Sequence, residues 1–440
     1  MKELFKNRNY KLLFWGNLVS EMGNVLFGFV AGLYVQDLLI SSGGSILGIG
    51  SGIVLGLFMA LGAFVRLLFS PIAGVLVDRW NKVKIIYLTD YFRGIIFLIS
   101  AYVFFIGVSN DSAVIILLSI TVISGIISAF FGPAISSATP EIVGMDKLQQ
   151  ANGTNSLISS STMIMGVILG AAAFGLFSFH IALLLNGISF IISGFSEMFI
   201  KSEFKMEIQP DEHLNMLKDI KIGFNYIVKR NGLLTLLVYS LFLNLAFSPL
   251  FSVGIPYLFR TELSKGPWDL AWIDIAFGVS MTIAGIVVGG MKFKSMTKVI
   301  RKGLLFLFLS FLLSSTTIYL LSSGQISYSV FYIILIVANI SMAVFMMGVN
   351  IPLNTSMVKV IAPEIRGRVL STVSAISGGA VPIAIFLGGV IINLSSVAFL
   401  GIVCSALLIV PMLGFMFDKR VKDLLDGMDD EVNEQVQVVS

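Results

Sequence analysis

The sequence predicts an all-α, polytopic membrane protein with twelve transmembrane helices in two related halves of six helices each. Three observations lead to this prediction. Of the 440 residues, 56% are hydrophobic and only 12% are charged, about half the charged fraction of an ordinary soluble domain. Apolar stretches of about 20 residues, the length that crosses a bilayer, follow one another with short interruptions. One longer polar stretch divides them into two groups.

The twelve predicted helices are separated by short polar segments. An even number of spans places both termini on the same side of the membrane. Lys and Arg gather at the two termini and in alternate loops, whereas the opposite loops contain only Arg260 and Lys265. Basic loops remain in the cytoplasm, so both termini are predicted to be cytoplasmic. The predicted helices cover residues 10–36, 47–75, 84–107, 113–136, 151–178, 180–200, 233–258, 270–291, 303–321, 328–357, 369–394 and 396–417.

The polar stretch between the sixth and seventh helices predicts the domain organisation. It contains apolar residues at helical spacing among Lys and Asp, which indicates an amphipathic helix on the inner membrane face: Leu214, Leu217, Ile220, Phe224 and Ile227. A weak internal repeat relates the halves, because Gly74 and Lys82 recur as Gly290 and Lys298 at one constant offset. The predicted parts are an N-terminal half (1–200), a linker (201–232), a C-terminal half (233–417) and a cytoplasmic tail (418–440).

The turn between the second and third helices carries the most distinctive motif. It reads Gly74-Val-Leu-Val-Asp78-Arg79-Trp-Asn81-Lys82 and must lie at a membrane surface, since lipid cannot satisfy a non-helical backbone. This pattern resembles the loop 2–3 motif of the major facilitator superfamily, with Asn81 where Gly is commoner. The resemblance implies a gating loop in which Asp78 contacts a helix N-terminus near Arg366-Gly367-Arg368. The alternative is that the basic loop only sets the topology.

Further stretches resemble the macrolide-efflux branch of that superfamily. The resemblance covers nearly the whole chain and implies the major facilitator fold and proton-driven export of a hydrophobic or cationic drug. It also implies a bacterial cytoplasmic membrane location and a monomer, with no cofactor. Ala171 stands where related antiporters often have a proline, and the fourth helix lacks their basic residue. The stretches that carry the resemblance are Asn9-Tyr10 before Trp15-Gly16, Gly132-Pro133-Ala134 through Pro140-Glu141, Asp146-Lys-Leu, Asn231-Gly-Leu-Leu with Pro249, and Pro363-Glu364-Ile-Arg366-Gly367-Arg368.

Ionisable residues within predicted spans are costly to bury and are therefore functional candidates. On the first helix, Asn17, Glu21 and Asn24 share one face with Gly28. Glu21 and Arg66 of the second helix have matching predicted depths, so we expect them to approach one another. Glu21 would then be a protonatable switch or bind a cationic substrate group. The alternatives are a structural ion pair or two unrelated positions.

Other charged residues in the spans have simpler interpretations. Asp90 and Arg93 are three residues apart on the third helix and are predicted to form a structural pair there. Asp274 is expected near the outer end of the eighth helix, in the interfacial region rather than in the transport path.

The tenth helix offers a candidate cavity surface in the second half. Asn339, Met346, Asn350 and Asn354 recur at helical spacing, and methionine among amides suits an adaptable site for bulky ligands. The seventh helix adds Asn244. The alternative is that the amides join helices by hydrogen bonds while Met fills gaps between them.

The sequence also excludes several classes of protein. It contains no nucleophile–base set, no phosphate-binding loop and no spacing of metal ligands, so we expect neither an enzyme nor a metal protein. No feature indicates nucleic acid; the expected partners are a small-molecule substrate, protons and the lipid bilayer. Two alternatives to drug export stay open. One is export of a siderophore, lysolipid or other endogenous metabolite, and the other is a non-transporting membrane sensor or scaffold.

Overall fold

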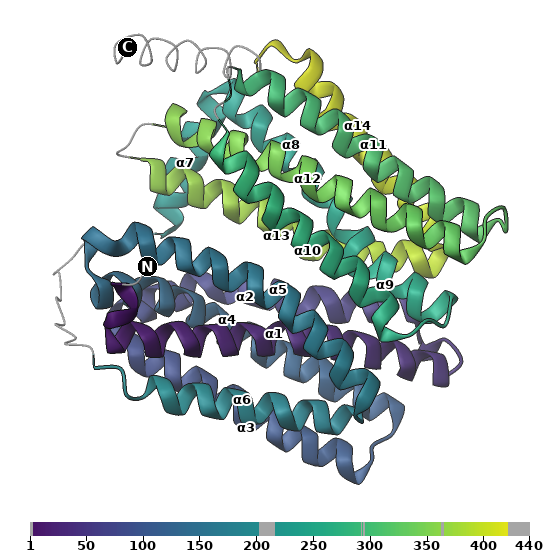
Figure 1. The fold of residues 1–440 in the computed structure, drawn as a ribbon, viewed down its shortest axis with the longest axis horizontal. Helices are drawn as coiled ribbons and strands as arrows, with labels where there is room; N and C mark the ends of the chain where they lie inside the picture. Colours follow the sequence, from purple (N-terminus) through teal and green to yellow (C-terminus); the bar gives the residue numbers. More distant parts are fainter. Residues whose placement is uncertain (1–2, 202–215, 292, 294, 362–364, 421–440) are drawn as a thin grey trace. The chain divides into compact units, whose positions relative to one another are not determined.

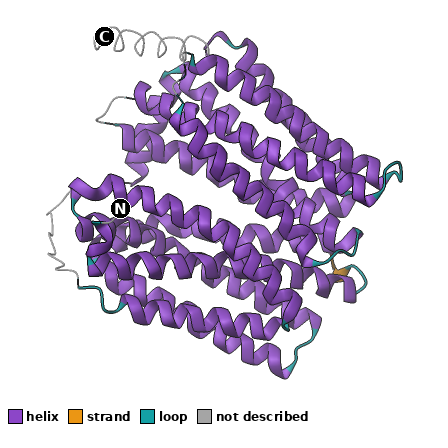
Figure 2. Cartoon of the chain, viewed as in Figure 1, coloured by secondary structure: helices purple, strands orange, loops and turns teal. Residues whose placement is uncertain are grey.

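The protein is almost entirely helical. The computed structural model describes residues 3–201, 216–291, 293, 295–361 and 365–420 (Figure 1). Within them, twelve helices are long and apolar enough to cross a membrane, as predicted. The strands β1 (Ser45–Ile46) and β2 (Ile49–Gly50) form a short antiparallel hairpin in the loop after the first span (Figure 2). This hairpin was not predicted.

The chain packs into two compact units. Unit 1 comprises Met1–Leu214 and Pro256–Ile275, and unit 2 comprises Asn215–Ile255 and Ala276–Ser440. Unit 1 is therefore more than the predicted N-terminal half, because a segment from the seventh and eighth spans packs within it. Its other elements are η1 (Leu4–Lys6), α1 (Arg8–Ser41), α2 (Ser51–Arg79), α3 (Lys82–Ile106), α4 (Asn110–Val143), η2 (Met145–Lys147), α5 (Leu148–Leu176) and α6 (Phe179–Glu197).

Four helix packings organise the described part of unit 1. α1 packs against α5 and α6, α3 packs against α6, and α2 packs mainly against α4. Small residues allow this proximity: a Cβ added at Gly125 of α4 would lie only 2.7 Å from the carbonyl oxygen of Gly62 on α2. Side chains fix the helix starts, since Asn7 Oδ1 accepts a hydrogen bond from the backbone N–H of Asn9 at the start of α1.

Unit 2 contains the remaining helices. α8 packs against α13 and α14, and α11 packs against α12 and α14. Gly388 of α13 meets Pro249 of α8 closely, because an added Cβ there would lie 2.6 Å from Pro249 Cβ. The elements are α7 (Met216–Lys229), α8 (Asn231–Pro249), η3 (Leu250–Gly254), the part of α10 (Pro267–Gly290) after Ile275, α11 (Met296–Ser322), α12 (Tyr328–Val360), α13 (Arg366–Leu394) and α14 (Val397–Phe417).

Most predicted elements are present, and the differences lie at their ends. The amphipathic helix expected in the linker is α7 over its described residues. The seventh span was predicted to end at 258, but helical structure continues to Glu262 through α9 (Ile255–Tyr257) and η4 (Leu258–Glu262). Both η3 and η4 are π-helical. The polar end of this span is helical because its arginine has a partner, described below.

Candidate functional site

The helix α1 has two different faces. Gly16, Ser20 and Gly23 are buried against the rest of unit 1, whereas the predicted polar face is only partly covered. Asn17, Glu21 and Asn24 on that face are half-buried, and Gly28 is exposed. A Cβ added at Gly28 would meet no atom within 4 Å. The residues that share this face by their spacing in the sequence are therefore less covered than Gly16, Ser20 and Gly23 on the other face.

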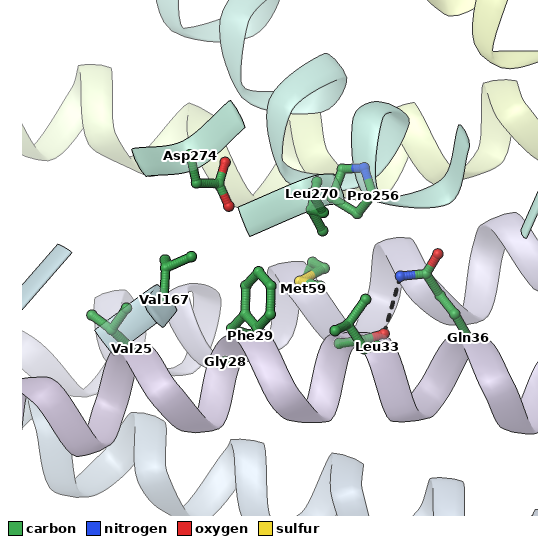
Figure 3. A pocket seen from close by; sticks show the side chains of 11 residues that line it. Val25, Gly28, Phe29, Leu33, Gln36, Met59, Val167, Pro256, Leu270 and Asp274 are labelled. Atoms are coloured by element: carbon green, nitrogen blue, oxygen red, sulfur yellow. Dashed lines mark hydrogen bonds between the residues drawn. The ribbon is translucent and has the colours of Figure 1, made fainter. Parts of the chain in front are cut away.

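The same face continues into a cavity of about 240 Å³ in unit 1 (Figure 3). Aliphatic, aromatic and methionine side chains supply most of the lining, and two polar side chains, Gln36 and Asp274, enter it from α1 and α10. Sites for drug-sized ligands typically measure about 300–1,000 Å³, so this cavity accommodates part of such a ligand. Its lining residues are Val25, Gly28, Phe29, Gly32, Leu33, Gln36, Met59, Val167, Pro256, Leu270 and Asp274.

The carboxylate of Asp274 has no partner in this cavity. Among the described residues it forms neither an ion pair nor a hydrogen bond, and its neighbours in Figure 3 are apolar. Asp274 lies seven residues after the start of α10, about 10 Å along the helix axis. We expected it at the interface, away from a transport path, but the structure places it in the wall of a cavity.

Gln36 has its own hydrogen bonds. Its Nε2 donates to the carbonyl oxygen of Gly32 at 3.2 Å, and its Oε1 accepts from the hydroxyl of Thr261 at 3.3 Å. The side chain is fully buried. Gln36 therefore has a fixed orientation, while Asp274 is the charged group of the cavity that remains available to a ligand.

An ion pair lies beside Gln36, near the C-terminal end of α1. The guanidinium of Arg260 in η4 donates from Nε and Nη2 to the two carboxylate oxygens of Asp37, at 2.5 and 2.7 Å. Its Cζ also lies 5.5 Å from the centroid of the Phe174 ring. A further hydrogen bond of 2.8 Å joins the hydroxyls of Ser51 and Tyr257. These contacts attach the segment Pro256–Ile275 to the first two helices of unit 1.

The expected approach of Glu21 and Arg66 is not present. Both side chains are described, and no ion pair or hydrogen bond joins them. Arg66 Nη2 instead lies 3.8 Å from the position of a Cβ added at Gly132 on α4. Arg66 and Glu21 have the same predicted depth in the membrane, but α2 packs mainly on α4, so the side chain of Arg66 does not face Glu21. Any role of Glu21 therefore does not depend on a direct pair with Arg66 in this conformation.

The predicted pair on α3 is present. Arg93 Nη1 lies 3.5 Å from Asp90 Oδ1, and both side chains are fully buried. Sequence reasoning missed the third charged member of this region, Glu197 at the end of α6, which is also fully buried. The sequence analysis did not consider Glu197, which lies at the end of an apolar span; the packing of α6 against α1 and α3 buries it.

The loop 2–3 motif is described in part. Asn81 Oδ1 accepts a hydrogen bond from the N–H of Lys84 at 3.0 Å and so caps α3, while Lys82 Nζ pairs with Glu141 of α4 at 2.8 Å. Gly74 is half-buried and Arg79 is exposed. The side chain of Asp78 and those of Arg366 and Arg368 lie outside the described residues, as does the contact expected between them.

The predicted cavity face of α12 is also present in part. Asn244, Met346, Asn350 and Asn354 line one cavity of about 240 Å³ in unit 2. Asn339 does not line it: this residue is fully buried, and its Nδ2 donates to the carbonyl oxygen of Leu335 at 2.8 Å. The sequence analysis named none of the other lining residues, which are Ser240, Leu243, Phe247, Leu307, Val349, Leu353, Met357, Val373, Ser374 and Ser377.

Comparisons with known proteins agree with this arrangement. A bacterial homologue of the iron transporter ferroportin, solved in an inward-facing state, superimposes with a TM-score of 0.68 and 16% identity. The match covers 93% of this chain and 98% of that one. Macrolide efflux protein A of Streptococcus pyogenes is 21% identical over 391 residues, covering 87% of this chain and 90% of that protein. The putative bacilysin exporter BacE of Bacillus subtilis (strain 168) is 30% identical over 260 residues, covering 56% and 58%.

The family follows from the model of the Major Facilitator Superfamily, which matches residues 13–364. Members of this family are membrane transporters rather than enzymes, which agrees with the twelve spans and with the two cavities in their walls. The chain belongs to the Major Facilitator Superfamily and is a multi-pass secondary transporter of a small molecule.

Proposed function

We propose that this transporter exports a lipophilic, positively charged small molecule from the cytoplasm in exchange for protons. The observation that carries the proposal is the unpartnered carboxylate of Asp274 in a largely apolar cavity, whose other polar side chain, Gln36, has hydrogen bonds of its own. An isolated carboxylate in such surroundings is costly unless it binds a cation or a proton. A lipophilic cation supplies both the charge for Asp274 and the apolar surface for the rest of the lining.

The cavity in unit 2 supports the same class of substrate. Its amide groups offer hydrogen bonds of either polarity, and its methionines adapt to different shapes. Macrolide efflux protein A, similar over most of the chain, is named for the export of one such class of bulky compounds. On this proposal Asp274 contacts the cationic group of a substrate in the cavity of unit 1. Asn244, Met346, Asn350 and Asn354 form a second candidate contact surface in unit 2, which suits apolar and hydroxyl-bearing groups.

Glu21 is the proposed proton-coupling residue. It is half-buried on the face of α1 that leads into the cavity of Asp274, with Asn17 and Asn24 beside it. A carboxyl group there can exchange protons with water without leaving the wall of the substrate path. The proposed cycle alternates access between the two sides, with both termini cytoplasmic, and the Asp37–Arg260 contact opens whenever the outer side opens.

Accumulation of ethidium and of a labelled macrolide, in cells with and without expression, tests the proposal. We expect expression to lower accumulation of at least one compound, and a protonophore or Glu21→Gln to abolish the difference. A protonophore-resistant difference would contradict proton coupling. No effect on either compound, with the folded protein present in the membrane, would contradict drug export.

A second candidate is export of a compound that the cell itself makes. The similarity to a putative bacilysin exporter favours it, although that match covers 58% of the exporter. Comparing metabolites in the growth medium of expressing and deleted strains separates the two candidates, because only this function depletes an endogenous compound from the medium on deletion.

A further inference from the structure

Three ionisable side chains form a closed cluster inside unit 1. Asp90 and Arg93 come from α3 and Glu197 comes from α6; their exposed fractions are 0%, 1% and 0%. The cluster is separate from both cavities, since none of its members lines either one. Its two acids and one base do not balance in charge.

Asp90 is the acid with partners in this cluster. Its Oδ2 accepts a hydrogen bond from the hydroxyl of Ser20 on α1, and its Oδ1 lies 3.5 Å from Arg93 Nη1. Ser193 of α6 completes the surroundings: its hydroxyl is 3.0 Å from that of Ser20 and donates to the carbonyl oxygen of Gly16 at 3.0 Å. A donor and a cation therefore stabilise the ionised form of Asp90.

Arg93 is held firmly in place. Its Nη2 donates to the hydroxyl of Ser128 on α4 at 2.9 Å. Its Cζ lies 4.9 Å from the ring centroid of Phe131 and 5.6 Å from that of Phe190, within the range of cation–π contacts. A guanidinium remains charged in proteins, so the cluster contains one fixed positive charge.

Glu197 is the acid without partners. Neither of its carboxyl oxygens accepts or donates a hydrogen bond within the described part of the chain, although both are buried. Its side chain packs against the backbone of Gly16, where an added Cβ would lie 2.6 Å from Glu197 Cγ. Asn186, which precedes Glu197 on α6, is likewise buried, and neither of its amide atoms has a hydrogen-bond partner among the described residues. Within the described ranges, then, an ionised Glu197 would have no hydrogen-bond donor on either carboxyl oxygen.

The charge count leads to the inference. With both acids ionised, the cluster would carry a net negative charge in a site that excludes water, and an unbalanced buried charge is strongly destabilising. With one proton the cluster is neutral. We propose that the Asp90–Arg93–Glu197 cluster is a proton-binding site, occupied by a single proton on the carboxyl group of Glu197.

The remaining charges near the cluster do not remove this need for a proton. Electrostatic interactions reach Arg93 from Glu21 on α1 and from Arg66 on α2. These two have opposite signs, and the interaction with Glu21 is the stronger, so they do not supply the positive charge that the cluster lacks. α4 contributes the neutral Ser128 and Phe131, and Glu197 itself interacts with Asp90 and Arg93.

This site goes beyond the proposed transport cycle and does not rest on it. The proton belongs to the folded chain, and its detection needs neither substrate nor a gradient. The link to α1 is nevertheless direct, because Ser20, which donates to Asp90, precedes Glu21 in the sequence. A movement of α1 that removes the Ser20 hydrogen bond would shift the proton between the two acids.

Infrared spectroscopy of the purified full-length protein at neutral pH tests the inference. The C=O stretching band of a protonated carboxylic acid is separated in frequency from the bands of carboxylates. This band also shifts when H₂O is replaced by D₂O. We expect the wild-type protein to lose one such band on Glu197→Gln. It should lose the same band on Asp90→Asn, because Glu197 must then ionise to balance Arg93. Glu141→Gln, which removes an acid paired with Lys82 at the helix ends, is the matched control and should leave the band unchanged.

Each outcome decides the question. A protonated-acid band that keeps its full wild-type intensity in Glu197→Gln would overturn the proposal, as would an equal loss of intensity in Glu197→Gln and Glu141→Gln. Retention of the band in Asp90→Asn would show that the proton on Glu197 does not depend on the charge of Asp90. That result would overturn the argument from the charge balance of the cluster. Glu197→Gln preserves the shape and neutrality of the protonated acid, so it should fold; gel filtration checks this, and the comparison with Glu141→Gln stands without the Asp90 variant.

Discussion

Arg260 donates two hydrogen bonds of 2.5 and 2.7 Å to the carboxylate of Asp37, and this ion pair joins η4 to the C-terminal end of α1. The two residues are far apart in the sequence and belong to different predicted halves. The pair is bidentate, a geometry in which arginine binds carboxylates with high directional specificity. Its side chains are 22% and 33% exposed, so water still screens it, and its free energy is modest.

In the proposed cycle, with both termini cytoplasmic, the Asp37–Arg260 pair lies on the outer side, so Arg260→Gln should favour opening there. We expect loss of the pair to cost about 1 kcal/mol, which shifts the ratio of open to closed forms about fivefold. Labelling of Gly28→Cys by a membrane-impermeant thiol reagent from outside measures the shift, since Gly28 lines the cavity and the native Cys404 is buried. Exchanging the charges, as Asp37→Arg with Arg260→Asp, should restore slow labelling. Equal labelling with and without Arg260→Gln would refute this role.

Asp274→Asn should weaken the binding of a cationic substrate. Replacing the carboxylate by an amide removes a charged hydrogen bond worth about 1.5–3 kcal/mol, so we expect at least a tenfold rise in the KM for ethidium efflux. Asp269→Asn is the control, because Asp269 lies on the same helix, in its first turn, but does not line the cavity. Similar effects of the two substitutions would mean that Asp274 acts through the fold rather than through the ligand.

Most of the fold could be predicted because the bilayer leaves few choices. A chain of this composition must satisfy its backbone within helices, and the lengths of the apolar stretches set the number of spans. The end of the seventh span was missed because Arg260 and Glu262 look like loop residues. Arg260 can remain in helical structure because Asp37 neutralises it, and that contact is not visible in the sequence.

The candidate site was predictable where a single helix determines it. The spacing of Asn17, Glu21 and Asn24 defined a face of α1 before any tertiary contact was known. Relationships between helices were not predictable. Arg66 and Glu21 have the same predicted depth in the membrane but do not form a pair. The burial of Glu197 depends on the approach of α6 to Gly16, which is a contact between residues distant in sequence. The orientation of a helix about its axis comes from packing, which local periodicity does not contain.

Asn350→Ala and Asn339→Ala should have opposite consequences, although both remove an amide from α12. Asn350 lines the cavity, so its loss should reduce substrate affinity several-fold while the thermal unfolding midpoint stays unchanged. Asn339 is fully buried and donates to the Leu335 carbonyl, so its loss leaves a void and should lower the midpoint. Binding and unfolding measured on the same purified samples separate the two roles, and a lower midpoint for Asn350→Ala would contradict the assignment.

Gly16→Ala should destabilise unit 1 through Glu197. The new Cβ would lie 2.6 Å from Glu197 Cγ and 2.7 Å from Cδ, too close without movement of α1 or α6. Overpacking of this kind costs about 1–3 kcal/mol. Gly28→Ala on the same helix is the matched control, because its Cβ meets no atom within 4 Å. Gel filtration after heating gives the unfolding midpoints.

The double variant with Glu197→Ala should recover most of the loss, since it removes the clashing atoms and leaves Asp90 and Arg93 balanced. Failure of that recovery would place the strain elsewhere than at the contact between Gly16 and Glu197.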